Sequence, residues 1–162
     1  MVQGNARIIE PEGQTPGTNQ VRRSNSVTGR SPILSPPALA GVVTILLVED
    51  NRDLADAMSL ALERCGFRVV TTYDPGHAAG IFTDEPDRWT AVVSDQVMPG
   101  MTGLALHARL RAIRSDVCFI LCTGFVDHAV ERAAHRAGIA AVVVKPFSMD
   151  DLVTCIRAAR TI

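Results

Sequence analysis

Short apolar runs alternate with amphipathic segments along most of the chain. Each run is followed by a segment with apolar residues at helical spacing, which is the pattern of a buried parallel strand and its crossover helix. Five such repeats predict an α/β fold, a doubly wound five-stranded parallel sheet with helices on both faces. The expected strands are 44–48, 67–72, 89–94, 117–122 and 140–144.

Capping residues mark where the helices begin and end. Asp50 or Asn51 is placed to cap the first helix, and Gly66 supplies its stop. Ser148 and Asp151 resemble a capping box, with Asp at the position where Glu or Gln is usual. The expected helices are 52–65, a short one opened by Pro75, one marked by Leu104 to Ile113, 127–137 and a last one through Arg160.

Residues 1–41 differ in composition from the rest of the chain. They are rich in Gly, Pro, Ser, Thr, Asn and Gln and show no apolar periodicity before Ile33 and Leu34. A segment of this kind cannot bury enough apolar surface to offset its ordering entropy. We therefore expect a disordered N-terminal tail over 1–41 and one domain over 42–162.

Charge and hydropathy exclude two classes of partner. The formal net charge is −1, whereas a nucleic-acid-binding chain is expected to carry a basic patch. The longest apolar run, from 38 to 48, is too short for a membrane helix, which needs roughly 20 apolar residues, and it does not form a secretory signal. We expect a cytoplasmic protein that contacts neither nucleic acid nor membrane.

The cysteines and histidines suggest no catalytic or metal-binding role. No Cys-x-x-Cys spacing occurs, so buried thiols in a reducing compartment are expected rather than a zinc site or a disulfide. The histidines fall at polar positions of the expected helices and should be solvated. These residues are Cys65, Cys118, Cys122, Cys155, His77, His107, His128 and His135.

Four of the expected strands are followed by or end in side chains that can carry chemistry. Glu49 and Asp50 follow the first strand, Asp95 the third, Thr123 the fourth, and Lys145, the only lysine of the chain, the fifth. A lysine is a compact charge on a flexible stem that can follow one phosphate oxygen. Because ligands of parallel sheets bind outside the carboxyl ends of the strands, we expect these residues to converge on one anion-binding edge.

The acidic residues also predict a metal site. Three carboxylates within a few ångström repel one another unless a cation joins them. Oxygen ligands without histidine or cysteine suit Mg²⁺. Glu49, Asp50 and Asp95 are therefore candidate ligands of a magnesium ion.

Four sequence motifs together resemble a known family. Glu49-Asp50, the segment 94–103, Thr123-Gly124 and Lys145-Pro146-Phe147, in this order and spacing, resemble the receiver domain of two-component response regulators over about residues 42–160. The resemblance implies a flavodoxin-like strand order of 2-1-3-4-5, counted along the chain. The stretch 120–125 is most similar to receivers associated with hybrid histidine kinases.

The resemblance assigns roles to the residues at the strand ends. It implies that Asp95 is the nucleophile that accepts the phosphoryl group and that Asp50 and Asp95 bind Mg²⁺ directly. Glu49 would bind the ion through water, and the backbone carbonyl of Val97 would complete the protein ligands.

The resemblance also assigns the two remaining side chains of the site. It implies that Thr123 and Lys145 contact phosphoryl oxygens. A cis peptide bond at Lys145-Pro146 would aim the ammonium into the site.

The function implied is that of a stand-alone phosphoacceptor in a phosphorelay. It would accept phosphate from a sensor histidine kinase or a histidine phosphotransfer protein and catalyse its own phosphorylation and dephosphorylation, without being an enzyme for other substrates. It would signal by partner binding, relay phosphate or act as a phosphate sink. The expected partner face consists of helix 127–137, strand 140–144 and the last helix. Val142 stands where the family usually has Tyr or Phe.

Two other functions fit these residues less well. A receiver-like module that binds partners without phosphorylation would not need the intact residue set. A haloacid-dehalogenase-like phosphatase would need a second acid two residues after the nucleophile, but Asp95 is followed by Gln96 and Val97.

Overall fold

The structure is a computed structural model that describes residues 6–8, 42–124 and 128–159. The strands are β1 (Ala6–Ile8), β2 (Thr44–Val48), β3 (Arg68–Thr72), β4 (Ala91–Asp95), β5 (Phe119–Thr123) and β6 (Ala141–Val144). The helices are α1 (Arg52–Arg64), α2 (Pro75–Asp84), α3 (Gly103–Ile113), α4 (His128–Ala137) and α5 (Met149–Ala159), with a 3-10 turn at Pro86–Arg88. Each of the five predicted strand and helix repeats is present.

The sheet has the predicted topology. Its strand order is β1-β6-β5-β4-β2-β3, and the five strands from β2 to β6 are all parallel. Counted along the chain from β2, these five strands follow the order 2-1-3-4-5. β2 therefore lies between β3 and β4, and the connections from β2 and β4 leave in opposite directions. In parallel sheets of this kind, ligands bind at the carboxyl ends of the strands where the connections diverge.

A sixth strand was not predicted. Ala6–Ile8 lies in the tail expected to lack regular structure, yet it forms β1 and pairs antiparallel with β6, with Arg7 opposite Val142. Three residues are too few to show a period-2 pattern, so the sequence gives no strand signal there. Residues 9–41, for which disorder was also expected, lie outside the described residues, and the domain boundary at 42 stays a prediction.

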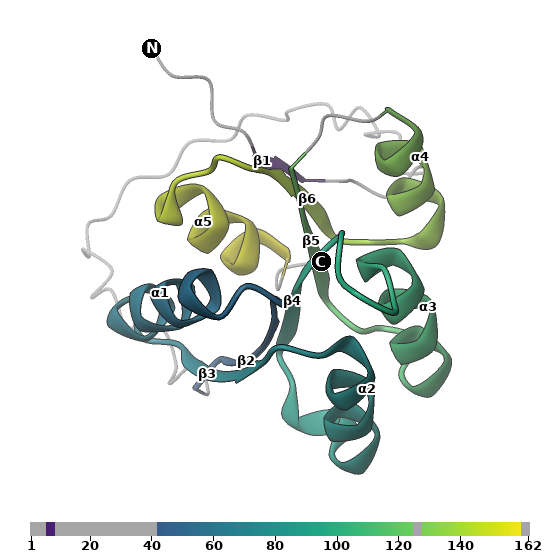
Figure 1. Cartoon of the computed structure of the whole chain (residues 1–162), viewed down its shortest axis with the longest axis horizontal. Helices are drawn as coiled ribbons and strands as arrows, with labels where there is room; N and C mark the ends of the chain where they lie inside the picture. The colour runs from purple at the N-terminus through teal and green to yellow at the C-terminus, as the bar shows by residue number, and fades with distance from the viewer. Residues whose placement is uncertain (1–5, 9–41, 125–127, 160–162) are drawn as a thin grey trace, which may run out of the picture.

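The helices cover both faces of the sheet. α1 and α5 pack on one face, and α2, α3 and α4 pack on the other (Figure 1). The strands between them are buried on both sides, which explains why β2 and β4 are apolar along almost their whole length. None of the helices in the described ranges is long and apolar enough to span a membrane.

The residues that cap the helices are those predicted from the sequence. The Asn51 side chain accepts a hydrogen bond from the Leu54 N–H at 3.1 Å, so Asn51 rather than Asp50 caps α1. Gly66 ends the helix with φ of +90°, a conformation that a side chain would strain. At α5, the Asp151 N–H donates to the Ser148 hydroxyl oxygen at 3.1 Å and the Ser148 N–H donates back to the Asp151 carboxylate at 3.1 Å, which confirms the capping box.

One of the four histidines contradicts the expectation of solvation. His107 in α3 is only 1% exposed, packs edge-on against Phe119 with ring centroids 5.0 Å apart, and has no hydrogen-bond partner on either ring nitrogen within the described residues. Burial, with a smaller contribution from Arg111, lowers the pKa of its imidazole to about 4. A neutral imidazole can pack in the core as an aromatic ring. The prediction was wrong because it treated this histidine as a polar surface residue.

The prediction for the cysteines is correct in part. Cys122 and Cys155 are buried, whereas Cys118 is half-buried and Cys65 is exposed at the end of α1. Burial raises the pKa of the Cys122 thiol to about 12, so this neighbour of Thr123 stays protonated. None of the four forms a disulfide within the described residues.

Candidate phosphoacceptor and metal site

The predicted site residues come together at the carboxyl ends of neighbouring strands. Glu49 and Asp50 follow β2, Asp95 ends β4, Thr123 ends β5, and Lys145 follows β6. Parallel pairing brings these ends side by side, because Val48 lies opposite Ser94 and Asp95 lies opposite Cys122. The strand order of the sheet thus assembles residues that are up to 96 positions apart in the chain.

Glu49 and Asp50 lie in different environments although they are adjacent. The Glu49 side chain is 4% exposed, and one of its oxygens accepts a hydrogen bond from the Asn51 N–H at 3.3 Å. Asp50 is exposed at the mouth of the site. The two carboxylates can therefore approach one ligand from the inside and from the solvent side.

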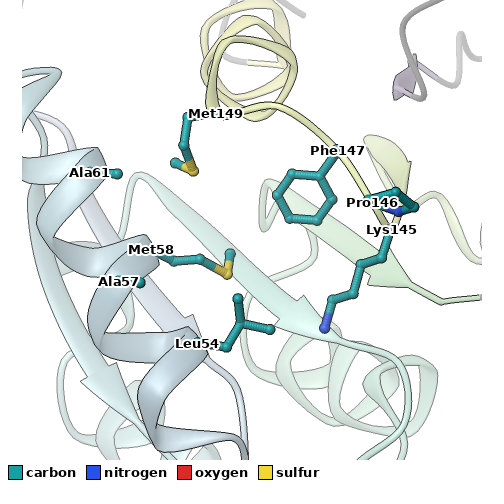
Figure 2. A pocket seen from close by; sticks show the side chains of 8 residues that line it. All are labelled: Leu54, Ala57, Met58, Ala61, Lys145, Pro146, Phe147 and Met149. Carbon is teal, nitrogen blue, oxygen red and sulfur yellow. The ribbon is translucent and has the colours of Figure 1, made fainter.

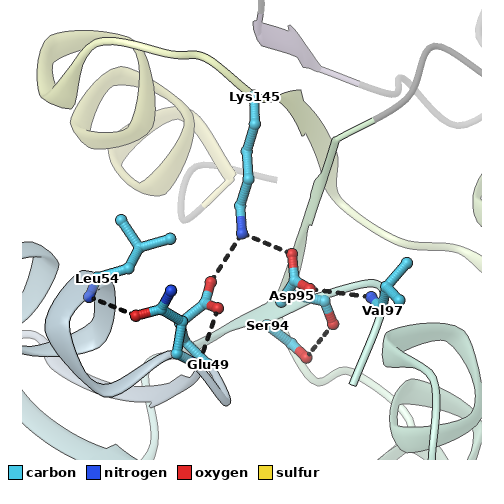
Figure 3. Close-up of polar contacts among 7 residues, drawn as sticks. Glu49, Leu54, Ser94, Asp95, Val97 and Lys145 are labelled. Carbon is cyan, nitrogen blue, oxygen red and sulfur yellow. Dashed lines mark hydrogen bonds and ion pairs between the residues drawn. The ribbon is translucent and has the colours of Figure 1, made fainter. Parts of the chain in front are cut away.

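Asp95 is held by both of its carboxylate oxygens (Figure 3). The Val97 N–H donates to Oδ2 at 3.0 Å, and the Lys145 ammonium lies 2.7 Å from Oδ1. The side chain is 10% exposed, so a small part of the carboxylate remains accessible to solvent. These contacts fix the orientation of the carboxylate, as a nucleophile requires.

Lys145 forms ion pairs with both buried acids. Its Nζ lies 2.8 Å from Glu49 Oε2 as well as 2.7 Å from Asp95 Oδ1 (Figure 3). Burial, the largest single influence, disfavours the charged lysine, but the hydrogen bonds to Asp95 and Glu49 and the negative charges of these two acids together outweigh it, so the pKa of the ammonium is raised. The peptide bond between Lys145 and Pro146 is cis, as the family resemblance implied.

Thr123 and Val97 occupy the remaining predicted positions. Thr123 is buried, and its carbonyl accepts a hydrogen bond from the Lys145 N–H at 2.7 Å, which ties the ends of β5 and β6 together. The Val97 N–H faces Asp95, while the side chain is 70% exposed. A role of the Val97 carbonyl as a metal ligand stays a prediction.

The acids fit a small divalent cation. Glu49, Asp50 and Asp95 each offer one oxygen, and these oxygens all lie within 4.8 Å of one another. Three carboxylates and the single ammonium of Lys145 leave two negative charges at the site. Hard oxygen donors with this charge suit Mg²⁺.

Gln96 supports the site and was not singled out from the sequence. Its side-chain oxygen accepts from the Leu104 N–H at 3.1 Å, its carbonyl accepts from the Gly103 N–H at 3.0 Å, and its N–H donates to the Cys122 carbonyl at 2.7 Å. These bonds fix the loop after Asp95 to the start of α3 and to β5. The only sequence signal is a polar residue that directly follows a buried strand end.

An apolar groove of about 420 Å³ lies beside the site, between α1 and the connection from β6 to α5 (Figure 2). Lys145 lies at one end of it, so the groove leads toward the carboxylates. The other lining residues are Leu54, Ala57, Met58, Ala61, Pro146, Phe147 and Met149.

Known proteins are similar to this chain in sequence. The sequence profile of the response regulator receiver domain matches residues 45–157. The C4-dicarboxylate transport transcriptional regulatory protein DctD of Rhizobium meliloti (strain 1021) is 36% identical over 122 residues, which are 75% of this chain but only 26% of DctD. The response regulator receiver protein CpdR of Brucella abortus (strain 2308) is 36% identical over 110 residues, 67% of this chain and 89% of CpdR.

A solved receiver domain has the same fold. The response regulator receiver domain protein from Clostridium thermocellum superposes with a TM-score of 0.71 at 24% identity, over 74% of this chain and 95% of that chain. The profile match extends from β2 into α5 and thus includes every strand end that contributes to the site. The chain therefore belongs to the response regulator receiver domain family of two-component systems.

Proposed function

We propose that this domain accepts a phosphoryl group on Asp95 from the phosphohistidine of a sensor histidine kinase or of a histidine phosphotransfer protein. The observation that carries the proposal is the set of contacts that the Asp95 carboxylate makes. The carboxylate is ordered by the Val97 amide and the Lys145 ammonium, and it lies beside two further acids at the open end of the sheet. A nucleophile, a countercharge and a candidate metal site thus meet at one point.

The chemistry proposed is a direct displacement at phosphorus. A carboxylate oxygen of Asp95 forms a new O–P bond while the P–N bond to the donor imidazole breaks, and the imidazole leaves with the bonding electron pair and takes a proton from solvent. Phosphoryl transfer depends on positioning and charge neutralisation rather than on a protein base. This agrees with a site in which acids, a hydroxyl and an ammonium are the side chains brought together.

Each residue has a separate task in this proposal. Lys145 moves from its present ion pair with Asp95 to a phosphoryl oxygen, and the Thr123 hydroxyl donates to another. Glu49, Asp50 and Asp95 would hold Mg²⁺, which when bound neutralises charge on the transferring group. The Val97 N–H keeps the nucleophile in place. Hydrolysis of the aspartyl phosphate by water would return the domain to its starting state.

Partner binding is proposed at two surfaces. The apolar groove beside Lys145 supports docking of the donor protein, because an amphipathic helix buries its apolar face in grooves of this kind. The face of α4, β6 and α5 is the proposed surface for a downstream partner. Val142 in β6 is buried and β-branched, so it cannot act as a rotating aromatic switch, and the change on this face would run through backbone shifts.

Intact mass after incubation with acetyl phosphate and Mg²⁺ tests the proposal. The protein should gain the mass of one phosphoryl group, Asp95→Asn should gain none, and addition of a chelator should stop labelling. Asp84→Asn is the matched control, since Asp84 is an exposed acid at the end of α2. Equal labelling of Asp95→Asn and the wild type would refute the assignment. A folded, Mg²⁺-binding protein that never gains mass would favour a module that works without phosphorylation.

A further inference from the structure

Without β1, β6 would be the outer strand of the parallel sheet. One side of β6 pairs with β5 from Ala141 to Val144, and the other side pairs with β1 from Ala141 to Val143. Thirty-five residues separate Ile8 from Thr44, where the alternating strands and helices begin. The outer edge of β6 is therefore occupied by a segment that is not part of the parallel βα repeats.

This edge is a preformed template for an extended chain. Ala141 and Val143 are buried in the cluster under α1 and α5, and Val142 is buried in the cluster on the opposite face. β5 and the helices on both faces thus hold β6 in place independently of β1 (Figure 1). Loss of β1 would leave a fixed strand with a row of unpaired backbone donors and acceptors, and such edges readily accept another strand.

The pairing of β1 is weak enough to exchange. A net backbone hydrogen bond is worth about a fivefold change in an equilibrium constant, so a ladder of three residues favours the paired state by about a hundredfold. Closing a loop of 35 residues disfavours it by a factor of about 200. The two factors nearly cancel, and the paired state therefore competes poorly against another strand.

We propose that the outer edge of β6 is a site of β-strand addition, that Ala6–Ile8 occupies it in the free protein, and that an extended segment of a partner protein displaces Ala6–Ile8. The sequence Ala-Arg-Ile indicates what the edge accepts, namely apolar residues on either side of a basic one. The incoming segment has no proline where its N–H groups face β6. The inference rests on the proposed function only in that α4, β6 and α5 form the output surface.

The test compares two deletions of equal length. Deletion of residues 1–9 removes β1, whereas deletion of residues 10–18 keeps it. The probe is a synthetic peptide of residues 1–12 of this chain, and the readout is the amide NMR signals of Ala141, Val142 and Val143. The peptide should shift these signals in the chain without residues 1–9. Because the two factors nearly cancel, β1 should be paired about half of the time, and binding to the full chain and to the control deletion should be about twofold weaker.

A double proline variant provides a second route. Replacement of both Ala6 and Arg7 by Pro in the full chain removes a backbone N–H that faces β6, because one of two successive N–H groups of an antiparallel strand must do so. The peptide affinity of this double variant should approach that of the chain without residues 1–9. The same peptide should bind equally well in an Asp95→Asn background, because strand addition does not need the phosphoacceptor. Failure of the strand inference is thereby distinguished from failure of the phosphoryl-transfer proposal.

Four results would overturn the inference. Equal peptide affinity for all chains, or no shift at Ala141 to Val143, would show that the edge does not accept a strand. A dimer of the truncated chain that protects these amides would assign the edge to a second copy instead of a partner segment. Unfolding of both the truncated chain and the double proline variant would show that β1 is a fixed part of the fold.

Discussion

Gly103 allows a specific prediction about the backbone at Asp95, the proposed phosphoacceptor. It is the first residue of α3 and packs against the end of β4. A Cβ placed on Gly103 would lie 2.5 Å from the backbone carbonyl oxygen of Asp95 and 2.5 Å from Cδ1 of Leu121. Ordinary van der Waals contact begins at 3.4 Å, so in Gly103→Ala the strand end or the start of α3 has to move.

The expected size follows from which atoms can move. The Leu121 side chain can change rotamer, but the Asp95 carbonyl belongs to a buried strand and cannot shift alone. Overpacking of this kind costs about 1–3 kcal/mol, and we expect about 2 kcal/mol for Gly103→Ala. Displacement of Asp95 should also slow phosphorylation, since a misplacement of about 1 Å can cost roughly a hundredfold in rate.

Urea unfolding and the rate of labelling by acetyl phosphate measure both effects. Gly80→Ala is the control, because Gly80 is exposed in the interior of α2 and a Cβ there meets no atom within 4 Å. It should stabilise the protein by about 0.5–1 kcal/mol through helix propensity and leave labelling unchanged. A Gly103→Ala protein that is as stable and as rapidly labelled as the wild type would refute the close contact.

Two further predictions concern charge. Burial lowers the pKa of His107 in the folded protein to about 4, against an ordinary value of 6.5. The contribution of the neutral imidazole to the free energy of unfolding should therefore be fully present above pH 6.5, and this free energy should fall by on the order of 3 kcal/mol as the pH drops toward 4. His107→Leu should flatten this part of a urea-unfolding profile, exposed His128→Gln should not, and identical profiles for His107→Leu and the wild type would show that the buried imidazole does not titrate this way. Asp50→Asn removes one of the three clustered carboxylates, so it should raise the melting temperature in chelator and reduce the stabilisation by Mg²⁺. A lower melting temperature in chelator would mean that Asp50 makes a structural contact.

Local pattern was sufficient to predict the five parallel strands and the five helices. Apolar runs bounded by polar and glycine residues located the five strands and five helices, because hydrophobic periodicity and capping act over a few residues. The residues that meet at the candidate site were also named from the sequence, since four strands lead directly into acids, a hydroxyl or a lysine. Strand order came from the family resemblance, because periodicity says that strands are buried but not which strands are neighbours.

Three features were decided only when distant segments packed together. Glu49 and Asp50 are equivalent in sequence, yet Glu49 is enclosed and pairs with Lys145, while Asp50 faces solvent. His107 is polar in sequence, but contact with Phe119 makes it a core residue. Ala6–Ile8 has no strand pattern and becomes β1 because β6 offers it an edge. In each case the deciding contact joins residues far apart in the chain, and the chemistry of one side chain does not reveal which partner the fold will bring to it.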